Sequence, residues 1–77
     1  LLTQKDLNSC ISRTYFATCI KCHNTPNNSE FGYLLNISRN GTDERELYNK
    51  QFFFDGTSND IYVRTMNNKS WLNWIKV

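Results

Sequence analysis

The 77-residue sequence is poor in proline (one), glycine (three) and histidine (one), and no apolar run exceeds a few residues. A membrane-spanning helix needs about 20 consecutive apolar residues. The short apolar runs of this sequence therefore exclude such a helix, and we expect no membrane partner. The start lacks the charged segment and apolar stretch that are typical of a signal peptide. Because the chain begins with Leu1 rather than methionine, we expect it to be a fragment of a longer protein.

Charge of one sign is not concentrated anywhere along the chain. Nine Lys and Arg residues oppose seven Asp and Glu residues, and the longest charged cluster, residues 43–46, is mostly acidic. Nucleic-acid binding typically requires basic residues gathered on one face. We therefore expect no nucleic-acid partner.

The three cysteines, Cys10, Cys19 and Cys22, are an odd number, which is not typical of a small secreted domain with disulfide bonds. We expect free thiols and folding in a reducing compartment. If residues 15–22 form a strand, Cys19 and Cys22 point to opposite faces, too far apart for a disulfide.

What the sequence does contain is a series of short segments rich in aromatic and β-branched residues, separated by turn signals. The expected strands are residues 13–22, 32–38, 44–54, 60–66 and 70–77. Asn40-Gly41 predicts a hairpin turn, and Thr3 with Asp6 predicts a capped helical turn within residues 1–12. Tyr33, Leu35 and Ile37 are expected to share one face of their strand.

Because neighbouring strands with short connections usually pair, the pattern predicts a mainly β fold. We expect one domain over residues 1–77, an antiparallel meander of four or five strands with an N-terminal helical turn; a small α+β fold is the alternative. The only candidates to cover the sheet are that helical turn and residues 71–77. The core is expected to contain Trp71 with Tyr62 or Phe53.

Residues 60–77 carry a resemblance to a known family. The segment has an aromatic residue, Tyr62, then Arg64, a polar turn, Trp71-x-x-Trp74, and finally Lys76 and Val77. This order resembles the closing motif of pyocin-knob domains, which occur in tail fibres and receptor-binding proteins of bacteriophages and phage-like bacteriocins. Outside these residues the resemblance is loose, and residues 13–14 and 19–23 depart from the family pattern.

The resemblance implies a non-catalytic, knob-like domain of a phage tail fibre or receptor-binding protein. Such a domain would help the virion tail to attach to host cell-wall polysaccharide, or would space the adhesive domain. The family also implies a homotrimer within a fibre, assembled in the host cytoplasm, and no cofactor. These remain expectations about fold, partner and location.

A carbohydrate-binding site is expected on the C-terminal hairpin. Trp74 is the candidate platform on which a sugar ring would stack, because we expect it to be more exposed than Trp71. Trp71 and Tyr62 are expected to have structural roles. The candidate polar contacts are Arg64, Asn67, Asn68 and Lys76. Amides match sugar hydroxyl groups as donors and acceptors, and the cations favour an anionic polymer. For Arg64 itself we favour a structural role, in which the guanidinium stacks on an aromatic ring such as that of a tryptophan, over direct contact with a phosphate or carboxylate.

Two other functions were weighed against adhesion. Cys19-x-x-Cys22-His23 matches the attachment motif of c-type haem, with Met66 as the only methionine ligand, and Cys10 could complete a zinc site. We expect neither, because a strand would separate the two thiols. With one histidine and acidic residues confined to turns (Asp43, Glu44, Glu46, Asp55 and Asp60), we also expect no enzyme.

Overall fold

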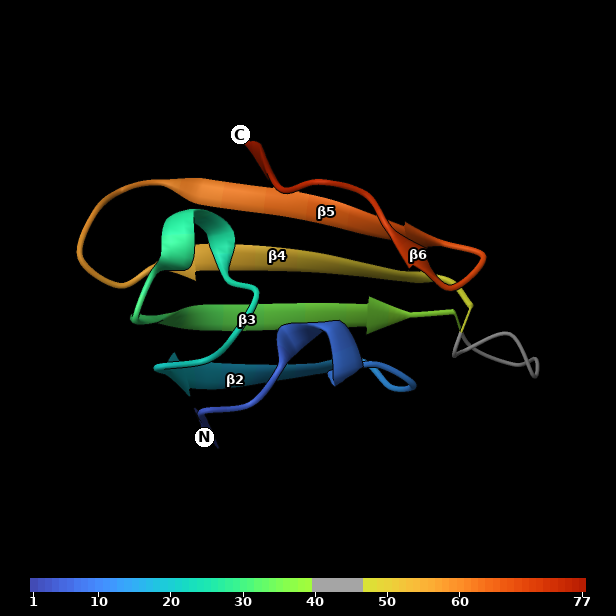
Figure 1. Ribbon diagram of the computed structural model, residues 1–77, viewed down its shortest axis with the longest axis horizontal. Helices are drawn as coiled ribbons and strands as arrows, with labels where there is room; N and C mark the ends of the chain where they lie inside the picture. Colours follow the sequence, from blue (N-terminus) through green and yellow to red (C-terminus); the bar gives the residue numbers. More distant parts are fainter. Residues whose placement is uncertain (40–46) are drawn as a thin grey trace.

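The computed structural model describes residues 1–39 and 47–77, which form a single β-sheet with two short 3-10 helices (Figure 1). The strands lie in the order β1-β2-β3-β4-β5-β6, and β7 also pairs with β5. Their bounds are β1 Leu2–Thr3, β2 Tyr15–Ile20, β3 Phe31–Ser38, β4 Asn49–Asp55, β5 Ile61–Asn67, β6 Ser70–Trp71 and β7 Ile75–Lys76. The helices are η1 Leu7–Ser9 and η2 Pro26–Asn28.

The mainly β prediction is confirmed, and the antiparallel meander is present from β2 to β5. The sheet is nevertheless mixed, because β1 pairs with β2 in parallel. The N-terminal prediction was wrong in detail: Thr3 belongs to β1, and Asp6 caps η1 by accepting a hydrogen bond from the Asn8 amide at 2.9 Å. The predicted turn at Asn40-Gly41 and the start of the 44–54 strand lie outside the described residues.

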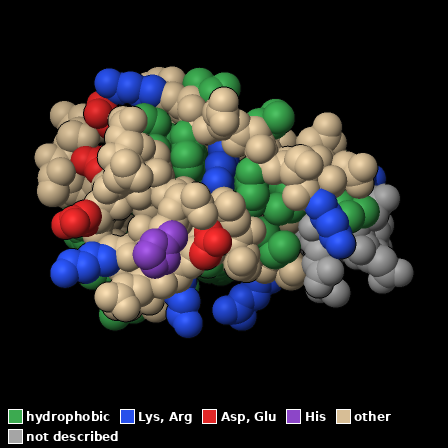
Figure 2. All heavy atoms as spheres, viewed as in Figure 1, with side chains coloured by type: hydrophobic (Ala, Val, Ile, Leu, Met, Phe, Trp, Pro, Cys, Tyr) green, Lys and Arg blue, Asp and Glu red, His purple; other side chains and the backbone are tan. Residues whose placement is uncertain are grey.

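The sheet has one covered face and one uncovered face. Alternation along the strands places Leu34, Phe53 and Arg64 on the inner face, under η1, η2 and the C-terminal segment, residues 70–77 (Figure 1). On this side of the molecule, hydrophobic side chains form only small separate patches among polar and charged ones (Figure 2). Tyr33 and Ile37 share the opposite, outer face, as the period-two pattern predicts, and both are exposed.

The hydrophobic core lies between the inner face and the covering segments. Its buried members are Leu7, Cys19, Cys22, Leu34 and Phe53. Phe53 packs edge-to-face on Trp74, with ring centroids 6.2 Å apart. Phe53 is thus a core residue, as expected. Trp71 is not part of this cluster; Trp74 packs against it instead, and Tyr62 packs at its edge.

Beside this core runs a row of polar side chains that crosses the sheet on its inner face. Tyr15, Asn36, Gln51 and Arg64 are register partners on β2, β3, β4 and β5. Gln51 is fully buried, and its Nε2 donates to the carbonyls of Leu7 at 2.8 Å and Cys10 at 3.2 Å. The row therefore ties the N-terminal segment to the sheet through two backbone carbonyls, of which that of Leu7 also accepts the Cys10 amide within η1.

Candidate functional site

The most unusual feature of the inner face is an arginine held between two indole rings. The guanidinium carbon of Arg64 lies 4.1 Å from the ring centroid of Trp71 and 4.4 Å from that of Trp74. Arg64 projects from β5, Trp71 belongs to β6, and Trp74 immediately precedes β7. The return of the chain through residues 67–75 thus brings both indoles over one strand. The stacking expected for Arg64 is confirmed, with two rings rather than one.

Hydrogen bonds fix the same guanidinium in its plane. Its Nε donates to Gln51 Oε1 at 2.9 Å, and its Nη1 donates to Asn8 Oδ1 at 2.8 Å. Its buried Nη2 has no hydrogen-bond partner within residues 1–39 and 47–77. Arg64 is 6 % exposed, so its position is set by packing and by these two bonds.

The charge of Arg64 is poorly compensated within the fold. Burial lowers the pKa of Arg64 to about 10, and attraction to the Asp6 carboxylate only partly offsets this effect. Among the described residues, no carboxylate forms an ion pair with Arg64. The guanidinium stays protonated at neutral pH and carries a positive charge in a site with little solvent. An anionic or strongly polar ligand nearby would be favoured electrostatically.

A cleft of about 260 Å³ opens beside Arg64, Trp71 and Trp74. Its remaining walls are mostly polar and come from η1, from the β2–β3 connection and from the segment before β7: Asn8, Asn24, Thr25, Asn28 and Asn73. Within the described part of the chain, the side chains of Asn28 and Asn73 make no hydrogen bond and are exposed. Their amide groups can therefore donate to and accept from a ligand.

Both indoles are anchored to segments that are distant in sequence. Trp71 Nε1 donates to the carbonyl of Asn8 at 3.1 Å, and Trp74 Nε1 donates to the carbonyl of Asn24 at 2.9 Å. Asp6 joins these two segments, since its Oδ1 accepts from the side chain of Asn24 at 2.8 Å as well as from the Asn8 amide. The hydrogen bond from Asn24, the largest effect, keeps the pKa of Asp6 below its usual value. The cleft is thus preorganised by several hydrogen bonds.

Asparagine suits the walls of this cleft for a backbone reason. Asn24 and Asn28 have φ angles of 61° and 55°, in the left-handed region that asparagine tolerates better than most residues. These conformations turn the β2–β3 connection toward the C-terminal segment. The high asparagine content of the sequence is the only sequence feature that indicates these residues. Composition alone does not predict which asparagines come together in the cleft.

The structure brings together only part of the site predicted from the sequence. Arg64 and Trp74 line the cleft, but Trp74 is half-buried like Trp71, so the expectation of a more exposed platform is not met. Asn67, the last residue of β5, and Asn68, in the β5–β6 turn, are exposed and are not among the residues that line the cleft. Lys76 forms an ion pair with Asp60 at 3.2 Å. Tyr62 accepts a hydrogen bond from the side chain of Asn27 at 2.9 Å, which suits its structural role.

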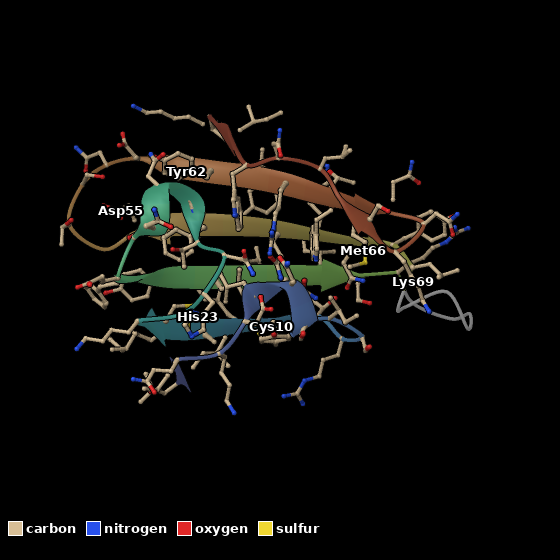
Figure 3. The ribbon with its side chains drawn as sticks, in the orientation of Figure 1. Cys10, His23, Asp55, Tyr62, Met66 and Lys69 are labelled. Atoms are coloured by element: carbon tan, nitrogen blue, oxygen red, sulfur yellow. The ribbon has the colours of Figure 1, made fainter. Side chains whose placement is uncertain are left out.

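The haem or metal alternative does not fit the geometry. The expected separation of Cys19 and Cys22 was wrong: β2 ends at Ile20, Lys21 turns with a φ of 50°, and both cysteines are buried in the core. His23 is exposed beside β2, whereas Met66 lies on β5 toward the opposite end of the sheet (Figure 3). No three His, Cys, Asp or Glu side chains in the described ranges are grouped so that they could hold a metal ion.

Among the described acidic residues, Asp55 is held as an anion by neighbouring hydroxyl groups. Asp55 accepts hydrogen bonds from Ser29 at 2.7 Å and Ser58 at 2.8 Å, and these bonds lower its pKa to about 2. A carboxyl group with so low a pKa is ionised near neutral pH and cannot act as a general acid. Three of the acidic residues expected in or beside turns, Asp43, Glu44 and Glu46, lie outside the described residues.

The three thiols lead to a testable prediction. Burial, together with interaction with the neighbouring Cys22 thiol, raises the pKa of Cys19 to about 12. Because the thiolate is the reactive form, Cys19 should not react in the native protein near neutral pH. Under non-reducing conditions, a thiol-specific chromogenic reagent should detect three thiols in denaturant, and Cys19 should react only after unfolding. Finding one thiol in denaturant would show a disulfide and contradict the prediction.

Comparison with known proteins adds no identification. The sequence matches no family model, and neither curated proteins nor solved structures give a match. Within residues 1–39 and 47–77, no helix is both long enough and apolar enough to cross a membrane.

Proposed function

We propose that this chain is a non-catalytic domain of a phage tail fibre or receptor-binding protein, and that its cleft beside Arg64 binds host cell-wall polysaccharide. The observation that carries the proposal is the combination of two indoles, one buried cation and two unpaired amides in a single cleft. Aromatic surfaces with amide donors and acceptors match the alternating faces and hydroxyl groups of sugars. In this proposal the domain belongs to a homotrimer in the virion tail, assembled in the host cytoplasm.

The charge of Arg64 refines the class of ligand. A buried guanidinium without a carboxylate partner favours a polymer that carries phosphate or carboxylate groups. A cleft of about 260 Å³ accommodates only one or two sugar units, so binding by one copy should be weak. Several copies on one fibre would raise the overall affinity through multivalency. The competing possibility is a spacer, in which the same cluster serves only to hold the C-terminal segment.

Binding should depend on the cleft and not on the β5–β6 turn. We expect the double variant Asn28→Gly with Asn73→Ala to bind about tenfold more weakly, because two hydrogen-bonding amides are lost. Glycine retains access to the φ of 55° at position 28. The measurement displays biotinylated protein in several copies on a streptavidin sensor, against purified bacterial cell-wall polysaccharides with and without phosphate.

The matched control is Asn67→Ala, which removes an exposed amide from the end of β5, next to the β5–β6 turn and outside the cleft. It should bind like the parent, and circular dichroism should show that all variants are folded. If the double variant binds as tightly as the parent, the cleft is not the glycan site. If the parent binds no polysaccharide of the panel, the spacer function is favoured.

A further inference from the structure

The outer face of the sheet is a continuous apolar surface. Strand register aligns one row of apolar side chains across five strands, β2, β3, β4, β5 and β7: Phe16, Leu35, Phe52, Val63 and Ile75. The next row contains Tyr33, Phe54 and Ile61. Across β3, Phe16 and Phe54 stack with ring centroids 5.9 Å apart and nearly parallel planes. Three of the phenylalanine rings, those of Phe16, Phe52 and Phe54, therefore lie on this face and outside the core.

Nothing in the described part of the chain covers this face. The helices η1 and η2 lie on the inner side (Figure 1), and so do the side chains of Trp71 and Trp74, which pack on Arg64. Phe16 is 63 % exposed and Ile75 is 64 % exposed, at opposite edges of the apolar row. Monomeric soluble proteins rarely expose so continuous an apolar surface.

The chemistry of the outer face limits what could cover it. In strands β2 to β5, the only charged side chain on this face is that of Lys50. A nucleic acid would require several cations near its phosphates, and a carbohydrate would require more hydrogen-bonding groups than the Tyr33 hydroxyl and a few threonines provide. A surface with almost no charge best complements another apolar surface of the same kind.

The size of the face also suits an interface between copies. The molecule measures 36 Å by 23 Å across its two longer axes, and the sheet is viewed along the third in Figure 1. The face therefore spans at most roughly 800 Å², and its upper bound is about what each partner contributes to a standard stable interface. Two such faces can pack about 10 Å apart with interdigitated side chains, as in a β-sandwich.

The small inner core gives a second, independent reason for association. Only six hydrophobic side chains are buried in the described residues: Leu7, Cys19, Cys22, Leu34, Phe53 and Met66. A chain of 77 residues buries a smaller fraction of its unfolded surface than a larger domain does, and chains of this size often gain stability by association. Covering the outer face would add aromatic burial that the isolated chain lacks.

We propose that a second copy of this chain covers the outer face, so that copies associate through the row from Phe16 to Ile75. The inference does not rest on polysaccharide binding, because it concerns the opposite side of the sheet. The proposed contact between copies does not require that the chain be part of a phage fibre. The measured mass of the oligomer gives the number of copies. A variant that no longer binds polysaccharide should have the same oligomeric mass as the parent.

The experiment is sedimentation equilibrium of the chain over micromolar to millimolar concentrations. The parent should have a mass that is a multiple of 9.1 kDa: twice for two sheets packed face to face, three times for three outer faces around an axis. Phe16→Glu and Ile75→Glu should each weaken association by about 100-fold or more, because each places a charge in an apolar interface. Both positions are exposed in the single chain, so each variant should keep its fold.

The matched control is Ser9→Glu, which introduces the same charge on η1, on the covered side of the sheet. It should associate like the parent. Circular dichroism and the emission of Trp71 and Trp74, which report on the inner side, should be those of the parent in all three variants. A folded monomeric parent would overturn the proposal. The proposal would also be overturned if Phe16→Glu and Ile75→Glu both formed the same oligomers as the parent, or if Ser9→Glu lost association to the same extent as these two variants.

Discussion

Phe53→Ala is expected to lower the free energy of unfolding by about 3–5 kcal/mol, as truncating a buried phenylalanine usually does. Phe53 is fully buried at the centre of the inner face and packs on Trp74 from the C-terminal segment. Its ring also fills the space above Gly32, where an added Cβ would lie only 2.4 Å from Phe53 Cζ. Few other side chains could close the cavity that the alanine variant would leave.

The loss is large relative to the total stability of a 77-residue domain, which is on the order of 4–12 kcal/mol. Chemical denaturation monitored by tryptophan emission should show the change, since Trp74 loses its aromatic neighbour. Phe53→Leu is the conservative control and should cost much less than the alanine variant. Retention of the parent's midpoint by Phe53→Ala would show that Phe53 does not anchor the core.

The strands were predictable from the sequence because their signals are local. Runs of aromatic and β-branched residues gave β2, β3 and β5 nearly to their ends, and alternation separated Ile61 and Val63 from Tyr62 and Arg64. The start of the chain was less predictable. Residues 2–3 form a strand only because β2 lies alongside them, and no local pattern contains that information.

Which face of the sheet is covered could not be predicted from hydrophobicity. On β3, the apolar Tyr33 and Ile37 face outward, whereas the polar Asn36 is fully buried. Asn36 can be buried because its side-chain amide donates to the carbonyl of Arg13 at 2.8 Å. That partner comes from a distant segment, so the sequence alone did not indicate that a polar row would be the covered one.

The candidate site was predictable only where its residues are close in sequence. Arg64, Trp71 and Trp74 lie within one segment, and their proximity drew attention to an arginine stacked on an indole. Asn8 and Asn24 enter the cleft from elsewhere, held by the indole hydrogen bonds. Conversely, Asn67 and Asn68 are close to Trp71 in sequence but do not line the cleft: Asn67 ends β5, and Asn68 begins the following turn with a φ of 50°.

The buried polar row gives the second large effect: Gln51→Leu should destabilise the domain by about 3–5 kcal/mol, although leucine is more hydrophobic than glutamine. The substitution leaves the Arg64 Nε and the Cys10 carbonyl without this partner, and it removes one of the two hydrogen bonds to the Leu7 carbonyl, which still accepts from the Cys10 amide at 3.2 Å. An unsatisfied buried polar group costs about 1–3 kcal/mol, and more when it is charged. Thermal and chemical denaturation should both show the loss.

A double-mutant cycle with Arg64→Met separates the cost of the unpaired charge from the loss of the two carbonyl contacts. Removing both Gln51 and Arg64 leaves no guanidinium to desolvate, so Gln51→Leu should cost less in the Arg64→Met background than in the parent, by about 1–3 kcal/mol. The remaining cost would report the contacts to Leu7 and Cys10, which fix η1 on the sheet. Additive effects in the cycle would mean that Gln51 and Arg64 do not depend on each other, contrary to the 2.9 Å hydrogen bond between them.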